Sequence, residues 1–243
     1  MFIAVNSGNG NSDVASYLKK NGIAWPTIVD QARMFEKAAG VKEISLNNIT
    51  GFRVLNANGA MVNSFGLESS AELAMSTAKW NVDPEGIPAS LKTSWQAIEF
   101  GDFVSAARTL QRALKSKNTE IQTAAQTLNE YVQGELADTL EKAAAAKTDG
   151  DEWLAFKTYT ELQYRFKGYD TGTDVKAELE TLADSESVKS QMLASRQLEN
   201  ALKTASRSGI QRAAKRLKKI IKQYPDTEAA QKAQDLLDAA GLK

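Results

Sequence analysis

The sequence predicts an α/β layer followed by an all-α region, and three observations carry this prediction. Two β-prone runs within Phe52–Phe65 flank Asn58-Gly59, a pair that tolerates the positive φ angles of a tight hairpin. Short strand and helix patterns precede this hairpin. Beyond Pro88, Gly and Pro become rare while Ala, Leu, Lys, Glu and Gln dominate, which favours helix. The 243 residues, 42% of them hydrophobic, are enough for two domains with separate cores.

The amino-acid composition excludes most common kinds of active site. The chain has no Cys and no His, so disulfides, thiol nucleophiles, imidazole bases and the usual zinc ligands are excluded. We therefore expect no catalytic residue, no cofactor and no metal site in this chain. Lys plus Arg and Asp plus Glu both number 30, so no global field attracts nucleic acid. No apolar run approaches the ~18 residues of a membrane span, and the chain as given is expected to be soluble.

The α/β layer occupies the residues before Trp80, and each element has its own signal. A wholly apolar run is typical of a strand buried on both faces, small polar residues and Gly mark helix ends, and Pro favours an extended backbone. The predicted elements are a strand at Phe2–Val5, a helix from Asn11 or Ser12 to Gly22, an extended segment at Ile23–Asp30, a second helix that Asp30 caps and that ends at Gly40, the hairpin, and a helix from Leu67 to Trp80.

Four short motifs in this region carry a resemblance. They are a strand ending in Val5-Asn6, a Trp25-Pro26-x-x-x-Asp30 segment, a helix ending in Ala38-Ala39-Gly40-Val41, and a hairpin of the form Phe52-x-Val54-Leu55-x-Ala57-x-Gly59. In this order they resemble the second half of a thioredoxin-like domain of the redoxin and thiol–disulfide oxidoreductase group. The resemblance covers Phe2 to Gly66 and implies an incomplete thioredoxin-like layer.

The chain departs from that family at both of its redox features. The family's Cys-x-x-Cys would lie upstream of Phe2, and Ile49 occupies the position of the family's cis-proline. A cis bond before a residue other than proline costs about 2.5–4 kcal/mol, so the site is altered even in a longer parent. Two interpretations stay open: a non-catalytic thioredoxin-like protein, or a fragment of an oxidoreductase whose cysteines lie upstream. The second implies a periplasmic or exported bacterial protein.

The linker is predicted at residues 81–88, which hold two of the four prolines and a glycine. This places the α/β domain at residues 1–80 and the helical domain at 89–243.

A short sequence motif recurs in the helical domain. A Gly followed by a helix with Ala and large apolar residues at fixed offsets recurs at Gly101, Gly150 and Gly209. In each copy Gly allows a tight turn and Ala lets two helices approach. The motif resembles degenerate tetratricopeptide-type repeats, although its copies are about 50–60 residues apart, whereas the standard repeat is 34 residues long. A long extra helix from Thr119 to Lys147 accounts for part of the excess.

The helical repeats favour a scaffold that binds a protein or peptide. The candidate anchors are the aromatic residues Trp95, Phe103, Trp153 and Tyr159. A basic face between Arg207 and Lys222 is interpreted as a solvated helix surface, because it has no interleaved aromatic residues for a nucleic acid. The exposed strand edge at Phe2–Val5 is a pairing hazard, and a homodimer through that edge is one remedy.

Overall fold

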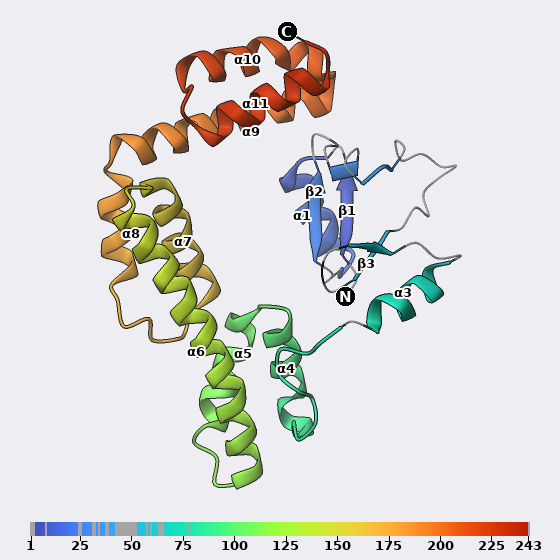
Figure 1. Ribbon diagram of the computed structural model, residues 1–243, viewed down its shortest axis with the longest axis vertical. Coiled ribbons are helices and arrows are strands. Elements are labelled where there is room, and N and C mark those ends of the chain that lie inside the picture. Colours follow the sequence, from blue (N-terminus) through green and yellow to red (C-terminus); the bar gives the residue numbers. More distant parts are fainter. Residues whose placement is uncertain are drawn as a thin grey trace. The chain divides into compact units, whose positions relative to one another are not determined.

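The computed structural model describes residues 3–7, 9–23, 26–30, 33, 35–36, 39–41, 53–56, 58, 60–62, 66–76 and 78–242. Backbone contacts divide the chain into two units, residues 78–189 and the combination of residues 1–77 with 190–243. Figure 1 shows small strands with helices in the N-terminal part and helices throughout the rest. The predicted order of strands with helices followed by a largely helical region is therefore confirmed, but the described strands form two separate two-stranded sheets instead of one layer.

The N-terminal part begins with a parallel strand–helix–strand unit. Strand β1 (Ala4–Ser7) pairs with β2 (Thr27–Asp30), and helix α1 (Asn11–Lys20) connects them. Helix α1 ends before Gly22, which has a φ of +64°, as predicted. Its N-cap is Gly10 rather than Asn11 or Ser12, and β1 begins two residues later than the predicted strand.

The parallel strands are not buried on both faces. Val5 and Ile28 are partners across the ladder, and they are 41% and 38% exposed. Val14 of α1, in contrast, is buried. The prediction of a strand buried on both faces is wrong, because an apolar run alone does not show whether another element covers each face.

Asp30 ends β2, and most of the helix predicted between Asp30 and Gly40 lies outside the described residues. The Asp30 carboxylate accepts a hydrogen bond from the Glu36 N–H at 2.8 Å, and both side chains are buried. Gly40, with a φ of +61°, follows at the predicted stop. Residues 42–52, which include the cis-proline position Ile49, lie outside the described residues.

The predicted hairpin is present with shorter strands. Strand β3 (Val54–Leu55) pairs antiparallel with β4 (Met61–Val62). The Asn56 side chain organises the turn by accepting hydrogen bonds from the Asn58 and Ala60 N–H groups at 3.0 and 2.9 Å. Helix α3 (Leu67–Met75) packs on both strands. It ends before the predicted Trp80, which instead packs edge-on against Trp95 at 5.0 Å.

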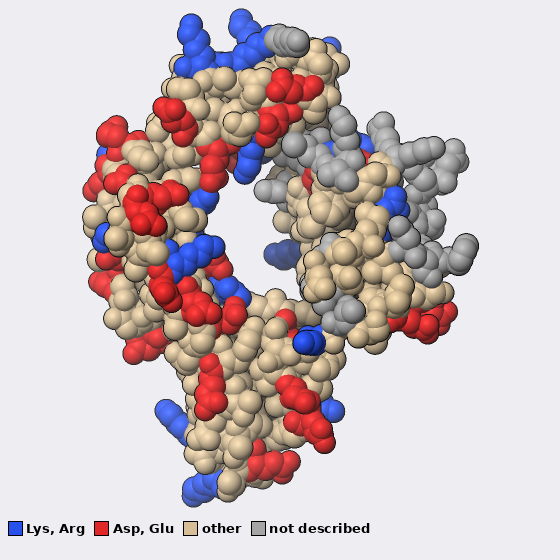
Figure 2. Space-filling view, viewed as in Figure 1, with Lys and Arg blue, Asp and Glu red and all other residues tan. Residues whose placement is uncertain are grey.

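The unit of residues 78–189 is helical and has one apolar core, whose largest fully buried side chains include Leu91, Ile98, Phe103, Leu110, Leu128, Leu162 and Phe166. Its elements are the 3-10 turn η1 (Ala89–Leu91), α4 (Lys92–Glu99), α5 (Phe103–Ala113), α6 (Thr119–Thr148), α7 (Glu152–Arg165), α8 (Val175–Ala183) and the start of α9 (Glu186–Ser208). Helix α6 matches the predicted long helix to within one residue. Figure 2 shows acidic and basic side chains on the surface of the helices.

The C-terminal residues form a second helical core. The rest of α9, α10 (Ile210–Gln223) and α11 (Glu228–Ala239) bury alanine, leucine and isoleucine side chains together. The buried set includes Ala194, Leu198, Ala201, Ala213, Leu217, Ile220, Ala233 and Leu237. The division between the two units falls within α9, at residues 189 and 190.

The predicted glycine turns all join consecutive helices. Gly101, Gly150 and Gly209 have φ angles of +74°, +77° and +85°. After each of the first two, an Asp donates its N–H to the carbonyl five residues before it, at 2.8 and 2.9 Å, which closes the preceding helix. The carboxylate of the same Asp accepts the N–H three residues later and so caps the following helix.

Helix α4 packs on α5 and α6 packs on α7, as predicted for the helices joined at Gly101 and Gly150. Ala106 and Ala155 follow Gly101 and Gly150 by five residues, Ala213 follows Gly209 by four, and each of the three alanines is 0% exposed.

Replacing glycine by alanine is expected to change the free energy of unfolding in opposite directions at these turns and inside a helix. Gly150→Ala places a side chain at a positive φ and should lower the free energy of unfolding by about 1–2 kcal/mol. Gly134→Ala, in the exposed middle of α6 with no atom near the new methyl group, should raise it by about 0.5–1 kcal/mol. Urea unfolding followed by circular dichroism measures both, and equal effects would contradict the assignment of Gly150 as a helix stop.

Candidate functional site

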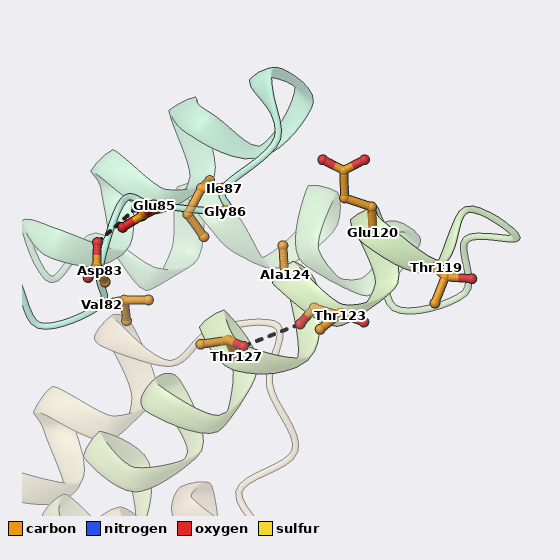
Figure 3. Close-up of a pocket in the computed structure, with 10 residues that line it drawn as sticks. All are labelled: Val82, Asp83, Glu85, Gly86, Ile87, Thr119, Glu120, Thr123, Ala124 and Thr127. Carbon is orange, nitrogen blue, oxygen red and sulfur yellow. Dashed lines mark hydrogen bonds between the residues drawn. The ribbon is translucent and has the colours of Figure 1, made fainter.

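An open groove of about 420 Å³ lies within the unit of residues 78–189. Figure 3 shows the segment from Val82 to Ile87 on one side and the first turns of α6 on the other. The ten lining residues are Val82, Asp83, Glu85, Gly86, Ile87, Thr119, Glu120, Thr123, Ala124 and Thr127.

The first wall is a tight turn in the segment predicted as a linker. The Asp83 carboxylate accepts the Glu85 N–H at 2.9 Å, and Ile87 donates its N–H to the Pro84 carbonyl at 3.2 Å. Gly86 allows the turn with a φ of +81°. Val82 and Ile87 are buried in the helical core on either side of it. The segment is therefore a packed part of the helical unit with a fixed turn between two apolar anchors.

Helix α4 holds this wall through its side chains. The Glu99 carboxylate accepts the backbone N–H groups of Asn81 and Val82 at 3.1 and 2.7 Å. The indole N–H of Trp95 donates to the Val82 carbonyl at 2.8 Å. Hydrogen bonds to a charged carboxylate are among the stronger ones in proteins, so these contacts fix the entry to the turn.

The second wall is the N-terminal end of α6. The Asn118 side chain caps the helix by accepting the Ile121 N–H at 3.2 Å. The Gln122 side chain donates to the Leu114 carbonyl at 3.2 Å and so ties α6 to the end of α5. The two walls are thus attached to a pair of adjoining helices, α4 and α5.

The lining has a specific chemistry. The apolar part of the lining consists of Val82, Ile87 and Ala124, each of which is at most 9% exposed. Three carboxylates, those of Asp83, Glu85 and Glu120, also line the groove, and no Lys or Arg does.

These carboxylates leave negative charge at the groove. The Asp83 carboxylate is engaged by the Glu85 N–H, whereas the exposed Glu85 and Glu120 side chains form no ion pair with any described residue. Glu120 also lies in the first turn of α6, where a negative charge interacts favourably with the helix dipole. Such a surface can hold a cationic side chain beside an apolar one.

Metal binding has no support in the described part of the chain, where no group of three or more His, Cys, Asp or Glu side chains is placed to hold an ion.

Arg165 lies where α5, α6 and α7 meet. Its guanidinium forms ion pairs with Glu135 of α6 at 2.8 Å and with Glu161 of its own helix at 3.1 Å. The same group lies over the rings of Phe103 at 4.7 Å and Phe166 at 5.4 Å. Cation–π contacts of this kind add to the packing of the two rings, which are 5.1 Å apart.

Two tyrosines beside this junction have raised pKa values. Burial raises the pKa of Tyr131, and the neighbouring carboxylates of Glu135 and Glu99 raise it further. Burial raises the pKa of Tyr169 to about 12, and its hydroxyl donates to the Phe103 carbonyl at 3.2 Å. Both tyrosines are therefore neutral structural groups at physiological pH.

The four predicted aromatic anchors occupy different environments. Phe103 is 0% exposed and Tyr159 is 5% exposed, so both are core residues. Trp95 is half-buried and holds the wall of the groove. Trp153 is also half-buried, stacks on Phe156 at 5.8 Å with an interplanar angle of 13°, and has a buried indole N–H with no hydrogen-bond partner among the described residues. The four residues therefore do not form one aromatic surface.

The groove residues were missed by sequence reasoning. Asp83, Glu85 and Gly86 fell within the predicted linker, and Thr119, Glu120 and Thr123 were treated only as the start of a helix. The signal that could have identified the first wall is the spacing of Val82 and Ile87, which is typical of two apolar anchors around a turn. Nothing local in the sequence indicates that α6 lies opposite.

Comparison with known proteins gives no relative: no family model, no curated protein and no solved structure matches the chain. No helix in the described residues is both long and apolar enough to cross a membrane.

Two phenylalanines three residues apart provide a test of the core. Phe103→Ala should lower the free energy of unfolding by about 3–5 kcal/mol, because it removes a fully buried ring. Phe100→Ala, at a position that is 60% exposed, should cost about 0.5 kcal/mol or less. Thermal or urea unfolding compares them, and a Phe103 variant as stable as the Phe100 variant would refute the assignment of Phe103 to the core.

Proposed function

We propose that this chain is a non-catalytic, protein-binding scaffold whose helical unit holds a short peptide segment in the groove between residues 82–87 and the start of α6. The single observation that carries the proposal is the lining of that groove. It combines buried apolar residues with three carboxylates and contains no Lys or Arg.

The chemistry of the lining determines the kind of segment that fits. A Lys or Arg side chain of the partner can approach Glu85 and Glu120, which have no ion-pair partner among the described residues. A neighbouring small apolar side chain can rest on Val82, Ile87 and Ala124. A volume of about 420 Å³ lies in the range of small-ligand and side-chain pockets and is enough for one or two side chains.

The walls support a binding role because they are held before any partner arrives. Hydrogen bonds from Glu99 and Trp95 fix the turn, and the Asn118 cap and Gln122 fix the start of α6. A preformed site loses less conformational entropy on binding than a site that must be ordered.

The N-terminal part is proposed to be a thioredoxin-like module without redox residues in this chain. The order of β1, α1, β2, the β3–β4 hairpin and α3 supports the resemblance drawn from the sequence. The helical part is proposed to be a degenerate tetratricopeptide-like array, supported by the helix pairs joined at Gly101, Gly150 and Gly209.

Selection from a phage library of random peptides, using the purified chain as bait, tests the groove. We expect the selected peptides to be enriched in Lys or Arg next to small apolar residues. Thr123→Arg places a bulky cation in the groove and should weaken binding of a selected peptide by about tenfold or more. A tenfold change in Kd corresponds to about 1.4 kcal/mol of binding free energy. Glu85→Gln combined with Glu120→Gln should weaken it as well.

The matched control is Gln126→Arg, an exposed position on the same helix that does not line the groove. This variant adds the same charge and should bind the selected peptide like the unmodified chain. Selected peptides without cationic residues, or binding that survives Thr123→Arg, would contradict the proposed site.

A further inference from the structure

Helix α10 carries an unusual concentration of positive charge. Its 14 residues include six Lys or Arg and no Asp or Glu. All six basic residues are exposed, namely Arg212, Lys215, Arg216, Lys218, Lys219 and Lys222, and we call this surface the α10 basic face. Figure 2 shows basic side chains gathered over α10. The opposite face supplies Ala213, Leu217 and Ile220 to the C-terminal core, where each is at most 1% exposed.

Four of the six charges on this face have no carboxylate partner among the described residues. Lysines on other helices pair with carboxylates, as Lys147 does with Glu178 at 2.7 Å and Lys203 with Glu199 at 2.8 Å. Arg212, Lys215, Lys219 and Lys222 form no such pair with a described residue. Arg216 donates to the neutral hydroxyl of Thr204 at 2.8 Å.

Two of the three acidic residues of the neighbouring helix α11 are engaged within that helix. Asp235 and Asp238 of α11 accept hydrogen bonds from Gln231 and Gln234 of the same helix, each at 2.9 Å. Like charges three or four residues apart on a helix destabilise it by roughly 0.2–0.5 kcal/mol for each pair. The α10 basic face therefore opposes the stability of its own helix, and packing in the C-terminal core does not require it.

The zero net charge of the chain conceals this surface. Residues 190–243 contain eleven Lys and Arg and five Asp and Glu, a net charge of +6. Residues 78–189 contain thirteen Lys and Arg and nineteen Asp and Glu, a net charge of −6. Residues 1–77 contain six Lys and Arg and six Asp and Glu. Beyond the Debye length of about 10 Å at 0.1 M salt, the molecule as a whole attracts neither sign.

We propose that the α10 basic face is a docking surface for a short acidic segment of a partner protein. The basic residues from Arg212 to Lys222 span about 15 Å of helix, at 1.5 Å per residue, which matches a segment with several carboxylates at similar intervals. A short acidic segment can bind by contacting this face alone. A long polyanion would also interact with the rest of the chain, whose net charge of zero provides no long-range attraction.

Two other anionic partners fit the observations less well. The exposed side of α10 has no aromatic residue on which bases could stack, as single-stranded nucleic acid requires. The apolar side of α10 is buried in the C-terminal core, so it cannot insert into a lipid surface as an amphipathic membrane helix does.

Fluorescence anisotropy on the full chain tests the proposal with three defined probes. They are a labelled peptide of alternating Glu and Ser, an oligothymidine of equal charge, and vesicles containing phosphatidylserine, all in low salt. We expect the chain to bind the peptide more tightly than the other two probes. Because the contacts are ionic, binding should weaken when salt is raised to ~0.5 M.

Matched triple variants locate the surface. Lys215→Gln, Lys219→Gln and Lys222→Gln together should weaken peptide binding about tenfold or more. Their free energy of unfolding should stay equal or rise, because Gln and Lys have similar helix propensities and like-charge repulsion is relieved. Lys92→Gln, Lys115→Gln and Lys142→Gln together change the net charge equally at exposed positions outside α10 and should leave peptide binding unchanged.

Four results would overturn the proposal. Tighter binding of oligothymidine or of vesicles would assign the face to a phosphate-bearing partner. An equal loss in both triple variants would show a non-specific effect of net charge. Binding to none of the three probes would leave the α10 basic face as a solvated surface only.

Discussion

The contacts of one guanidinium group connect most of the helical unit. Arg165 on α7 pairs with Glu135 on α6 and lies over Phe103 on α5. A Cβ atom at Gly101, the turn between α4 and α5, would lie 3.6 Å from its Nη2 atom. This junction sets the arrangement of the helices that carry both walls of the groove, because α4 holds residues 81–82 through Glu99 and Trp95 while α6 supplies the opposite wall. The groove is therefore a consequence of the same packing that stabilises the core.

Local signals in the sequence predicted much of the architecture. The three glycine turns depend on residues within a few positions of each other, so a sequence pattern is sufficient to place them. The same holds for the Asn58-Gly59 hairpin. Element ends were less predictable: α3 ends at Met75 instead of Trp80, and Trp80 packs on Trp95, a contact that no local pattern reveals.

The candidate site was not predictable in the same way. Its walls are separated by more than thirty positions in the sequence, and the acidic residues of Asp83-Pro84-Glu85 are typical of an ordinary turn. Phe103 and Tyr159 were predicted as binding residues from their aromatic character, yet burial depends on the neighbouring helices and places both in the core. The α10 basic face was visible in the sequence, but only the structure shows that Arg212, Lys215, Lys219 and Lys222 pair with no carboxylate of the described residues.

The central claim is that residues 82–87 and the start of α6 form one binding surface. The most direct measurement is an amide chemical-shift map of the ¹⁵N-labelled chain during titration with the peptide Ala-Lys-Leu-Ala, blocked at both ends. The account predicts that the largest shifts occur together at Gly86, Thr123 and Thr127, while Gly150 is unaffected. Shifts confined to α10 or to the N-terminal part, or no shifts at saturating peptide, would contradict it.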